Sequence, residues 1–404
     1  MATVATSTSK RVAAWPLSRL DVAGAFGDIG VLYPIAIALI TLNHLNPTAV
    51  FLAAGLTYVL AGWYFQIPIA VQPFKAVAAI ALAMSLPPSS IASAGLLMGI
   101  LLLIIGATNL ATWLARLFSL PIVRGIQLGL GLLLAREGLR LMLGPQSGLV
   151  LAGGTSIAAW EIALGGTVVL ALLQGSRRFP AALVLLAAGV ALGLAAHYGN
   201  LPSLGWGSVP LQLLHPKADE LWRVLPLLVV PQFALTFGNS IVATENTAQI
   251  LYGPQARRVT VRGLSLSLGV VNLASAMMMG SPLCHGSGGI TAHYKFGART
   301  PKSSYVIGGV CLLLALFGRA AVGVLNLIPT AVLGIFLVYV GIQHAAYLRD
   351  IVKRLPLLFI AACVGVVSLA TTNLMWGFLV GFALQAILFV LEKPREKQPA
   401  AKPR

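Results

Sequence analysis

A segment rich in glycine and hydroxyl side chains interrupts the apolar second half of the chain. It spans residues 280–300 and reads Gly-Ser-Pro-Leu-Cys-His-Gly-Ser-Gly-Gly-Ile-Thr-Ala-His-Tyr-Lys-Phe-Gly-Ala-Arg-Thr. Its proline and closely spaced glycines would break a membrane helix. Broken backbone at membrane depth is tolerated only where it lines a protein cavity or a water-filled one. The segment therefore predicts a site.

The chemistry predicted for this segment is anion binding. Pro282 favours extended backbone before it, and a helix that begins after Cys284 or His285 would turn free N–H groups toward a cavity. Those groups belong to Gly286, Ser287, Gly288 and Gly289. An oxyanion could approach them closely, and the helix dipole favours negative charge there. A close helix crossing or a plain glycine-rich loop would give the same pattern, and this segment alone leaves both readings open.

A second broken segment lies in the first half of the chain. Residues 68–79 read Pro-Ile-Ala-Val-Gln-Pro-Phe-Lys-Ala-Val-Ala-Ala, an extended run followed by a helix too short to span a bilayer. Paired interrupted segments in the two halves of a transporter indicate its binding site. We therefore expect Gln72, Phe74 and Lys75 to face the same ligand as the glycine-rich segment. The two breaks fall in the third and tenth apolar segments, which fits two repeats of seven.

Composition makes this a polytopic membrane protein with no appreciable soluble domain. Of its 404 residues, 58% are hydrophobic and 9% charged, and apolar runs of membrane length recur from about Val22 to Leu391. We predict an all-α fold of fourteen transmembrane segments in a membrane domain over residues 20–391. Its repeats would cover about 20–197 and 222–391, joined by a connection at 198–221. Residues 1–19 and 392–404 are predicted to be tails.

The net charge of +17 reflects membrane topology rather than nucleic-acid binding. The basic residues form short clusters between apolar runs, as the positive-inside rule requires. With fourteen crossings nearly all clusters fall on one face, which predicts cytoplasmic termini in a plasma (inner) membrane protein surrounded by lipid. The three cysteines, Cys284, Cys311 and Cys363, form no Cys-x-x-Cys pair, so neither a metal site nor a disulfide framework is indicated, and we expect no cofactor.

Several polar side chains inside apolar segments are candidates for the site. Asn239, Ser240 and Thr244 lie in a polar stretch of the eighth segment and could complete a ligand shell. Asp28, Glu245 and His285 are candidate proton carriers, because ionisable groups at membrane depth usually face a cavity or a partner. Asp28 could equally be a structural partner of Lys75. Four other histidines lie near predicted segment ends, where interfacial hydrogen bonding is expected: His44, His197, His215 and His344.

The two broken segments resemble the signature motifs of the molybdate transporter family related to sulfate permeases. The resemblance is carried by residues 68–79 and 281–299, and residues 24–34 are similar to the first helix of that family. It implies a fold of seven-plus-seven inverted repeats with core and gate domains, shared with sulfate permeases and uracil permease. It also implies molybdate as substrate and a homodimer. Phe74 stands where many relatives have methionine.

The expected function is secondary active transport of molybdate by alternating access. The dianion would bind between the two short helices, with Lys75 neutralising part of its charge. Because the membrane potential opposes anion entry, we expect coupling to protons. Sulfate or another oxyanion is the alternative substrate, and an anion channel the alternative class. An enzyme is disfavoured, since the sequence has no Gly-x-Ser-x-Gly elbow, His-Glu-x-x-His pair or Walker loop.

Overall fold

The structure is a computed structural model that describes residues 17–108, 110, 119–144, 148–151, 153–173, 181–198 and 205–391. These residues are mostly helical, as predicted. The predicted tails at residues 1–16 and 392–404, and residues 199–204 of the predicted connection, lie outside the described residues.

The first half of the chain contains eight helices and three of the four short strands among the described residues. In order they are α1 (Arg19–Ala25), α2 (Ile29–Leu42), α3 (Pro47–Phe65), β1 (Gln72–Pro73), α4 (Lys75–Ala83), α5 (Pro88–Ala107), α7 (Leu120–Leu143), β2 (Leu149–Val150), β3 (Ser156–Ile157), α8 (Ala159–Leu173) and α9 (Ala181–Ala196).

The second half begins with a long helical stretch in which α-helix alternates with π-helix. This stretch comprises α10 (Ala218–Val224), η2 (Leu225–Val229), α11 (Val230–Leu235), η3 (Thr236–Val242), α12 (Ala243–Tyr252) and the 3₁₀ turn η4 (Gly253–Ala256). Then follow α13 (Val261–Met277), β4 (Leu283–Cys284), α14 (Ser287–Lys295), α15 (Lys302–Leu316), α16 (Gly318–Asn326), α17 (Thr330–Ala345), η5 (Ala346–Asp350), α18 (Leu355–Thr371) and α19 (Leu374–Leu391).

Five helical stretches among the described residues are long and apolar enough to cross a membrane by themselves. They are Arg19–Leu42, Pro47–Phe65, Pro88–Ala107, Ala218–Ala256 and Thr330–Asp350. A bent pair, α15 and α16, passes the same test together, and five shorter apolar helices accompany these spans. The chain is therefore an integral, multi-pass membrane protein.

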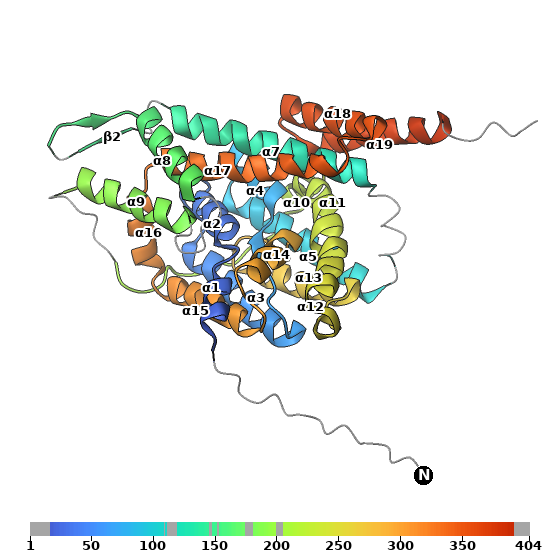
Figure 1. Ribbon diagram of the computed structural model, residues 1–404, viewed down its shortest axis with the longest axis horizontal. Helices are drawn as coiled ribbons and strands as arrows, with labels where there is room; N and C mark the ends of the chain where they lie inside the picture. The colour runs from blue at the N-terminus through green and yellow to red at the C-terminus, as the bar shows by residue number, and fades with distance from the viewer. Residues whose placement is uncertain are drawn as a thin grey trace, which may run out of the picture.

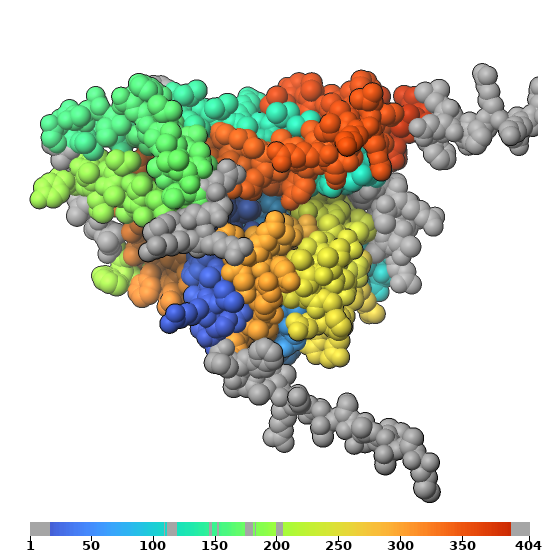
Figure 2. All heavy atoms as spheres, in the orientation of Figure 1, coloured from blue at the N-terminus to red at the C-terminus, as the bar shows by residue number. Residues whose placement is uncertain are grey.

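The two halves of the chain interlock through long helix pairs. Helix α5 packs on α13, α3 on α15, and α7 on α17. The α7–α17 crossing depends on glycine, since a Cβ at Gly131 would lie 2.5 Å from the Gly341 carbonyl oxygen and one at Gly341 would lie 2.6 Å from that of Gly131. Figure 1 shows α7, α17, α18 and α19 as one layer beside a bundle of the remaining helices. Figure 2 shows the same layer above the N-terminal and middle helices.

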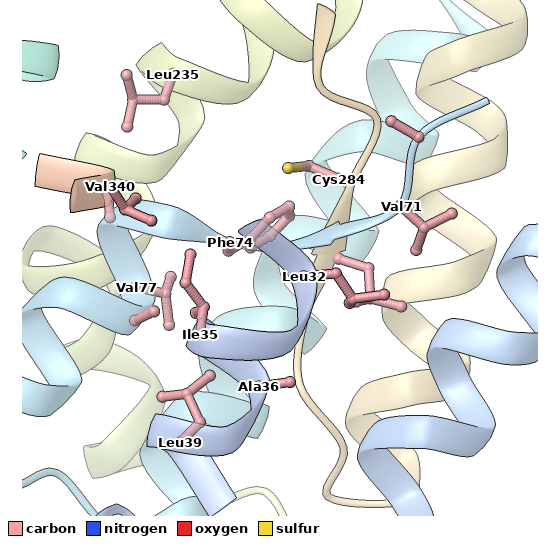
Figure 3. Packing of buried hydrophobic residues seen from close by; sticks show 14 of the residues in the cluster. Leu32, Ile35, Ala36, Leu39, Val71, Phe74, Val77, Leu235, Cys284 and Val340 are labelled. Carbon is pink, nitrogen blue, oxygen red and sulfur yellow. The ribbon is translucent and has the colours of Figure 1, made fainter. Parts of the chain in front are cut away.

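A short strand pair at the centre of the bundle brings the two interrupted segments together. Strands β1 and β4 are antiparallel, with Gln72 opposite Cys284 and Pro73 opposite Leu283. The side-chain amide of Asn272, on α13, binds both the N–H and the carbonyl of Leu283 at 2.8 Å. Figure 3 shows the Phe74 ring beside this crossing, near α2. The extended backbone at this crossing is thus hydrogen-bonded although it is not helical.

Candidate anion-binding site

Helix α4 begins at the strand crossing with most of its first amides already bonded. Phe74, the N-cap residue, is extended, and its own N–H donates to the Pro282 carbonyl at 2.8 Å. The N–H groups of Ala76 and Val77 donate to Oε1 of Gln232, at 2.9 and 3.3 Å. Gln232 comes from α11, so another helix supplies the cap that α4 lacks. The Phe74 amide is therefore already bonded within the protein.

The first backbone N–H groups of helix α14 are free of hydrogen-bond acceptors among the described residues. Gly286 is its N-cap residue, and the N–H groups of Gly289 and Ile290 donate to the Gly286 carbonyl. Within the described ranges, the N–H groups of Ser287 and Gly288 have no hydrogen-bond partner. Such a helix end attracts an anion through both its free donors and its dipole. The sequence predicts the same role for both short helices, but their N-termini differ in how many amides are free.

A cavity of about 380 Å³ lies beside α14, from its first turn onward. Gly288 and Gly289 line it, together with Asp28, Gln72 and Lys75. These five residues belong to the set predicted from sequence. Other lining residues come from α17, η5, α8 and α9. The residues from α8 and α9 are leucines and one alanine: Leu170, Leu173, Ala181 and Leu183. From α17 and η5 come the polar lining residues Tyr339, Gln343, His344 and Tyr347.

Lys75 gives the cavity its positive charge. It is the first residue of α4, it is only 9% exposed, and among the described residues its ammonium group makes neither a hydrogen bond nor a salt bridge. The Asp28 carboxylate lines the same cavity and attracts this ammonium group, but a buried ammonium without a direct hydrogen bond is still costly in a membrane. A bound anion would remove that cost, so this group favours an anionic ligand.

Asp28 and Gln72 form a polar pair at the edge of the same cavity. Nε2 of Gln72 donates to both carboxylate oxygens of Asp28, at 2.6 and 2.7 Å. Both side chains are almost fully buried, and Oε1 of Gln72 has no partner in the described structure. The bond joins the N-cap of α2 to β1, so Asp28 helps to position the first broken segment as well as lining the cavity.

A second, much smaller cavity of about 10 Å³ lies on the other side of Lys75. It is lined by Asn239 and Ser240, two residues expected to complete a ligand shell, and by further residues from α7, α11, β4 and α17: Gln127, Gln232, Leu235, Cys284 and His344. Asn239 also accepts a hydrogen bond from the Ser287 hydroxyl at 2.7 Å, which ties η3 to the start of α14. This space is about large enough for one water molecule.

Three other predicted residues lie away from both cavities and make structural contacts. His285 is fully buried, with Nδ1 2.9 Å from the Ala70 carbonyl and Nε2 3.1 Å from the Ser267 hydroxyl. The Thr244 hydroxyl donates to the His285 carbonyl at 2.8 Å. Glu245 accepts from the Val261 N–H at the start of α13. Both ring nitrogens of His285 are thus occupied, which favours a bracing role.

A sequence profile decides the family. The profile described as "Molybdate transporter of MFS superfamily" matches residues 21–134 and 225–343, more than half of the chain and both broken segments. The chain belongs to this molybdate transporter family. The resemblance seen in the two motifs is thereby confirmed.

Individual members of the family match along most of the chain. Molybdate transporter 2 of Arabidopsis thaliana is 29% identical and aligns with 92% of this chain and 88% of its own length. Molybdate transporter 1 of Chlamydomonas reinhardtii is also 29% identical, with 89% of both chains covered. These relatives are transporters rather than enzymes, so the chain is a transporter and not an enzyme.

The fold of this family member is that of sulfate-permease-like anion transporters. A structure of SLC26A9 superposes with a TM-score of 0.65 at 16% identity, covering 92% of this chain and 65% of that one. The transmembrane domain of the cyanobacterial bicarbonate transporter BicA superposes with a TM-score of 0.64 at 19% identity, covering 90% and 96%. At such identities the likeness concerns the fold alone.

Sequence reasoning missed the residues that α11 brings to the small cavity and that α17 and η5 bring to the large one. Gln232 carried no signal, because a lone glutamine in an apolar helix indicates nothing about its partner. A signal was present for Tyr339, Gln343 and Tyr347, because polar residues spaced four apart share one face of a helix. His344 was expected at a membrane interface, whereas it lies in the cavity wall and is only 6% exposed. The ring is covered because the chain continues from α17 directly into η5, whose Tyr347 packs edge-on against it.

Proposed function

We propose that this protein is a secondary active transporter that moves molybdate across the plasma (inner) membrane by alternating access. The observation that carries this proposal is the buried Lys75, whose ammonium group has no hydrogen bond or salt bridge among the described residues, in the cavity that the first turn of α14 lines through Gly288. The family and its named relatives support molybdate as the substrate. Sulfate, which has the same shape and charge, is the competing substrate.

The anion lies between Lys75 and the free N–H groups of Ser287 and Gly288. Gln72 and Gly289 shape this part of the cavity, and Asn239 and Ser240 line the smaller space behind Lys75. Phe74, Gly286, Thr244 and His285 act indirectly, by fixing the backbone of the two broken segments. The α14 end is the stronger anion ligand, because Gln232 already occupies two amides of α4.

Fourteen segments in two inverted repeats of seven provide the moving parts. The helix pairing supports this arrangement. If α3 of the first repeat corresponds to α13 of the second, and α5 to α15, then exchanging the repeats turns the α5–α13 pair into the α15–α3 pair, and both pairs are present. The first four segments of each repeat form the core, which carries α4 and α14. The rest, including α7 and α17, form the gate. Both termini are cytoplasmic, and the protein forms a homodimer.

Proton coupling supplies the driving force. A dianion moving against an inside-negative potential costs about 2.3 kcal/mol per charge per 100 mV, or about 4.6 kcal/mol in all. Co-transported protons reduce or reverse that cost. Of the carriers considered from sequence, Asp28 lines the cavity, whereas Glu245 and His285 are bonded elsewhere.

Uptake of labelled molybdate into proteoliposomes tests the function. Saturable uptake that a pH gradient accelerates, and that excess sulfate inhibits only weakly, is the expected result. Equal competition by equal sulfate would refute the choice of substrate. Currents far above carrier rates would refute the transport mechanism in favour of a channel.

A matched pair of lysine variants tests the site. Lys75→Met should reduce uptake at least about hundredfold, since a charge contact of this kind is worth several kcal/mol. Lys295→Met is the control, because Lys295 is an exposed lysine at the far end of α14. Unchanged uptake by folded Lys75→Met protein would contradict the proposed site.

A further inference from the structure

His344 occupies a special place between the two cavities. Among the described residues, it and Lys75 are the two that line both the large cavity and the small one. Lys75 belongs to the wall built around the two broken segments, whereas His344 belongs to α17 in the facing wall. An anion placed against Lys75 therefore lies beside the His344 ring.

The hydrogen bond made by His344 fixes which ring nitrogen can meet a ligand. Nδ1 lies 2.8 Å from the Val340 carbonyl oxygen. A carbonyl oxygen only accepts, so Nδ1 carries a hydrogen atom, and the neutral ring has its lone pair on Nε2. Nε2 has no hydrogen-bond partner within the described part of the chain. A lone pair repels an oxyanion oxygen, so contact between them requires a proton in between.

We propose that His344 is a substrate-binding residue of the gate wall that takes up one proton with each oxyanion bound. The inference rests on the proposed function and deepens it, because it assigns the coupling proton to a specific atom. The proton lies between Nε2 of His344 and an oxygen of the anion. Lys75 and the α14 N-terminus hold the same anion from the opposite wall.

The other charged and titratable groups around His344 favour coupling of proton to anion. Facing it across the cavities are Lys75, the Asp28 carboxyl and the Cys284 thiol. Tyr339 and Tyr347 lie on its own side, and the Tyr347 ring centroid is 6.0 Å from that of His344. Arg124 of α7 stacks over the Tyr347 ring and forms a salt bridge with Asp350. With the site empty, Lys75 opposes a second positive charge. A bound dianion reverses that balance, so anion and proton bind together.

Asp28 is less well placed to hold this proton. Both of its oxygens are bonded to Gln72, which belongs to the same wall. A proton on His344, by contrast, completes a contact from one wall to the other. The anion then draws α17 toward α4 and α14, and binding is coupled to closure of the cavity.

Proton uptake on binding can be counted by titration calorimetry of the purified, full-length protein. Molybdate is titrated at about pH 7.5 in two buffers that differ in protonation enthalpy. The wild type should take up about one proton per molybdate, and its affinity should fall as pH rises. His344→Gln keeps an N–H for the anion but cannot titrate, so it should bind molybdate with almost no proton uptake.

His197→Gln is the matched control. Nδ1 of His197 makes the same bond to the carbonyl four residues earlier, 2.9 Å from Gly193, but the residue lies at the end of α9 outside both cavities. This variant should take up as many protons as the wild type. If His344→Gln fails to fold, His344→Asn provides a second variant. The number of protons that the wild type takes up per molybdate can be measured without any variant.

The possible results separate the two proposals. Wild-type protein that binds molybdate without taking up a proton overturns the role of His344 and the proposed proton coupling, and leaves molybdate transport itself standing. Undiminished proton uptake by folded His344→Gln also overturns it, and places the proton on another group such as Asp28. If the wild type binds no molybdate at all, the proposed function fails, and the role of His344 fails with it.

Discussion

Replacing Gly288 by alanine should separate anion binding from folding. A Cβ at this position would meet only the Tyr347 hydroxyl oxygen, at 3.1 Å, and the residue lies in the first turn of α14. Alanine also favours a helix by up to about 1 kcal/mol over glycine. The variant should therefore fold as well as the wild type.

Binding should weaken because the added methyl group stands beside the free Gly288 N–H, in the space that the anion needs. A hydrogen bond to a charged group contributes about 1.5–3 kcal/mol. Its loss predicts a Kd for molybdate about 10 to 150 times higher. Calorimetric titration measures the Kd, and thermal unfolding in detergent measures stability.

Gly289→Ala is the control with the opposite expectation. Its Cβ would lie 2.4 Å from that of Ala70 and 2.6 Å from Oδ2 of Asp28, so buried atoms must move. Overpacking of this kind costs about 1–3 kcal/mol and should lower Tm. A folded Gly288→Ala protein with wild-type Kd would refute the assignment of the α14 N-terminus as the anion site. A Gly288→Ala protein that unfolds as early as Gly289→Ala would instead refute the expectation that a methyl group is accommodated at Gly288.

Two further substitutions test the supports of the broken segments by thermal unfolding. Gln232→Leu leaves the buried N–H groups of Ala76 and Val77 without an acceptor and should cost about 2–6 kcal/mol; an unchanged Tm would mean that this cap is not needed. Asn272→Ala removes both hydrogen bonds to the Leu283 backbone and should lower the free energy of unfolding by about 2–5 kcal/mol. Molybdate binding should also weaken, because β4 positions α14. Stability and binding equal to those of the wild type would contradict the bracing role of Asn272.

The sequence by itself determined where the chain is apolar, where it breaks and which residues carry charge inside it. These features are local. Pro73 and Pro282 restrict the backbone next to them, glycines leave the α14 amides uncovered, and an ionisable side chain such as Lys75 needs a cavity or a partner wherever it lies in a membrane. The family followed from such features, and the site that we propose lies in the same broken segments.

Only the tertiary structure decided which groups meet. Antiparallel pairing of β1 with β4 joins positions some two hundred residues apart, and no local rule specifies it. The packing of α11 on α4 lets Gln232 cap that helix, which makes the two half-helices unequal. The packing of α17 on α7 and α2 brings His344 opposite Lys75. A side chain's partner depends on which helix faces which, and that is set by close packing of the whole bundle rather than by the spacing of residues along one helix.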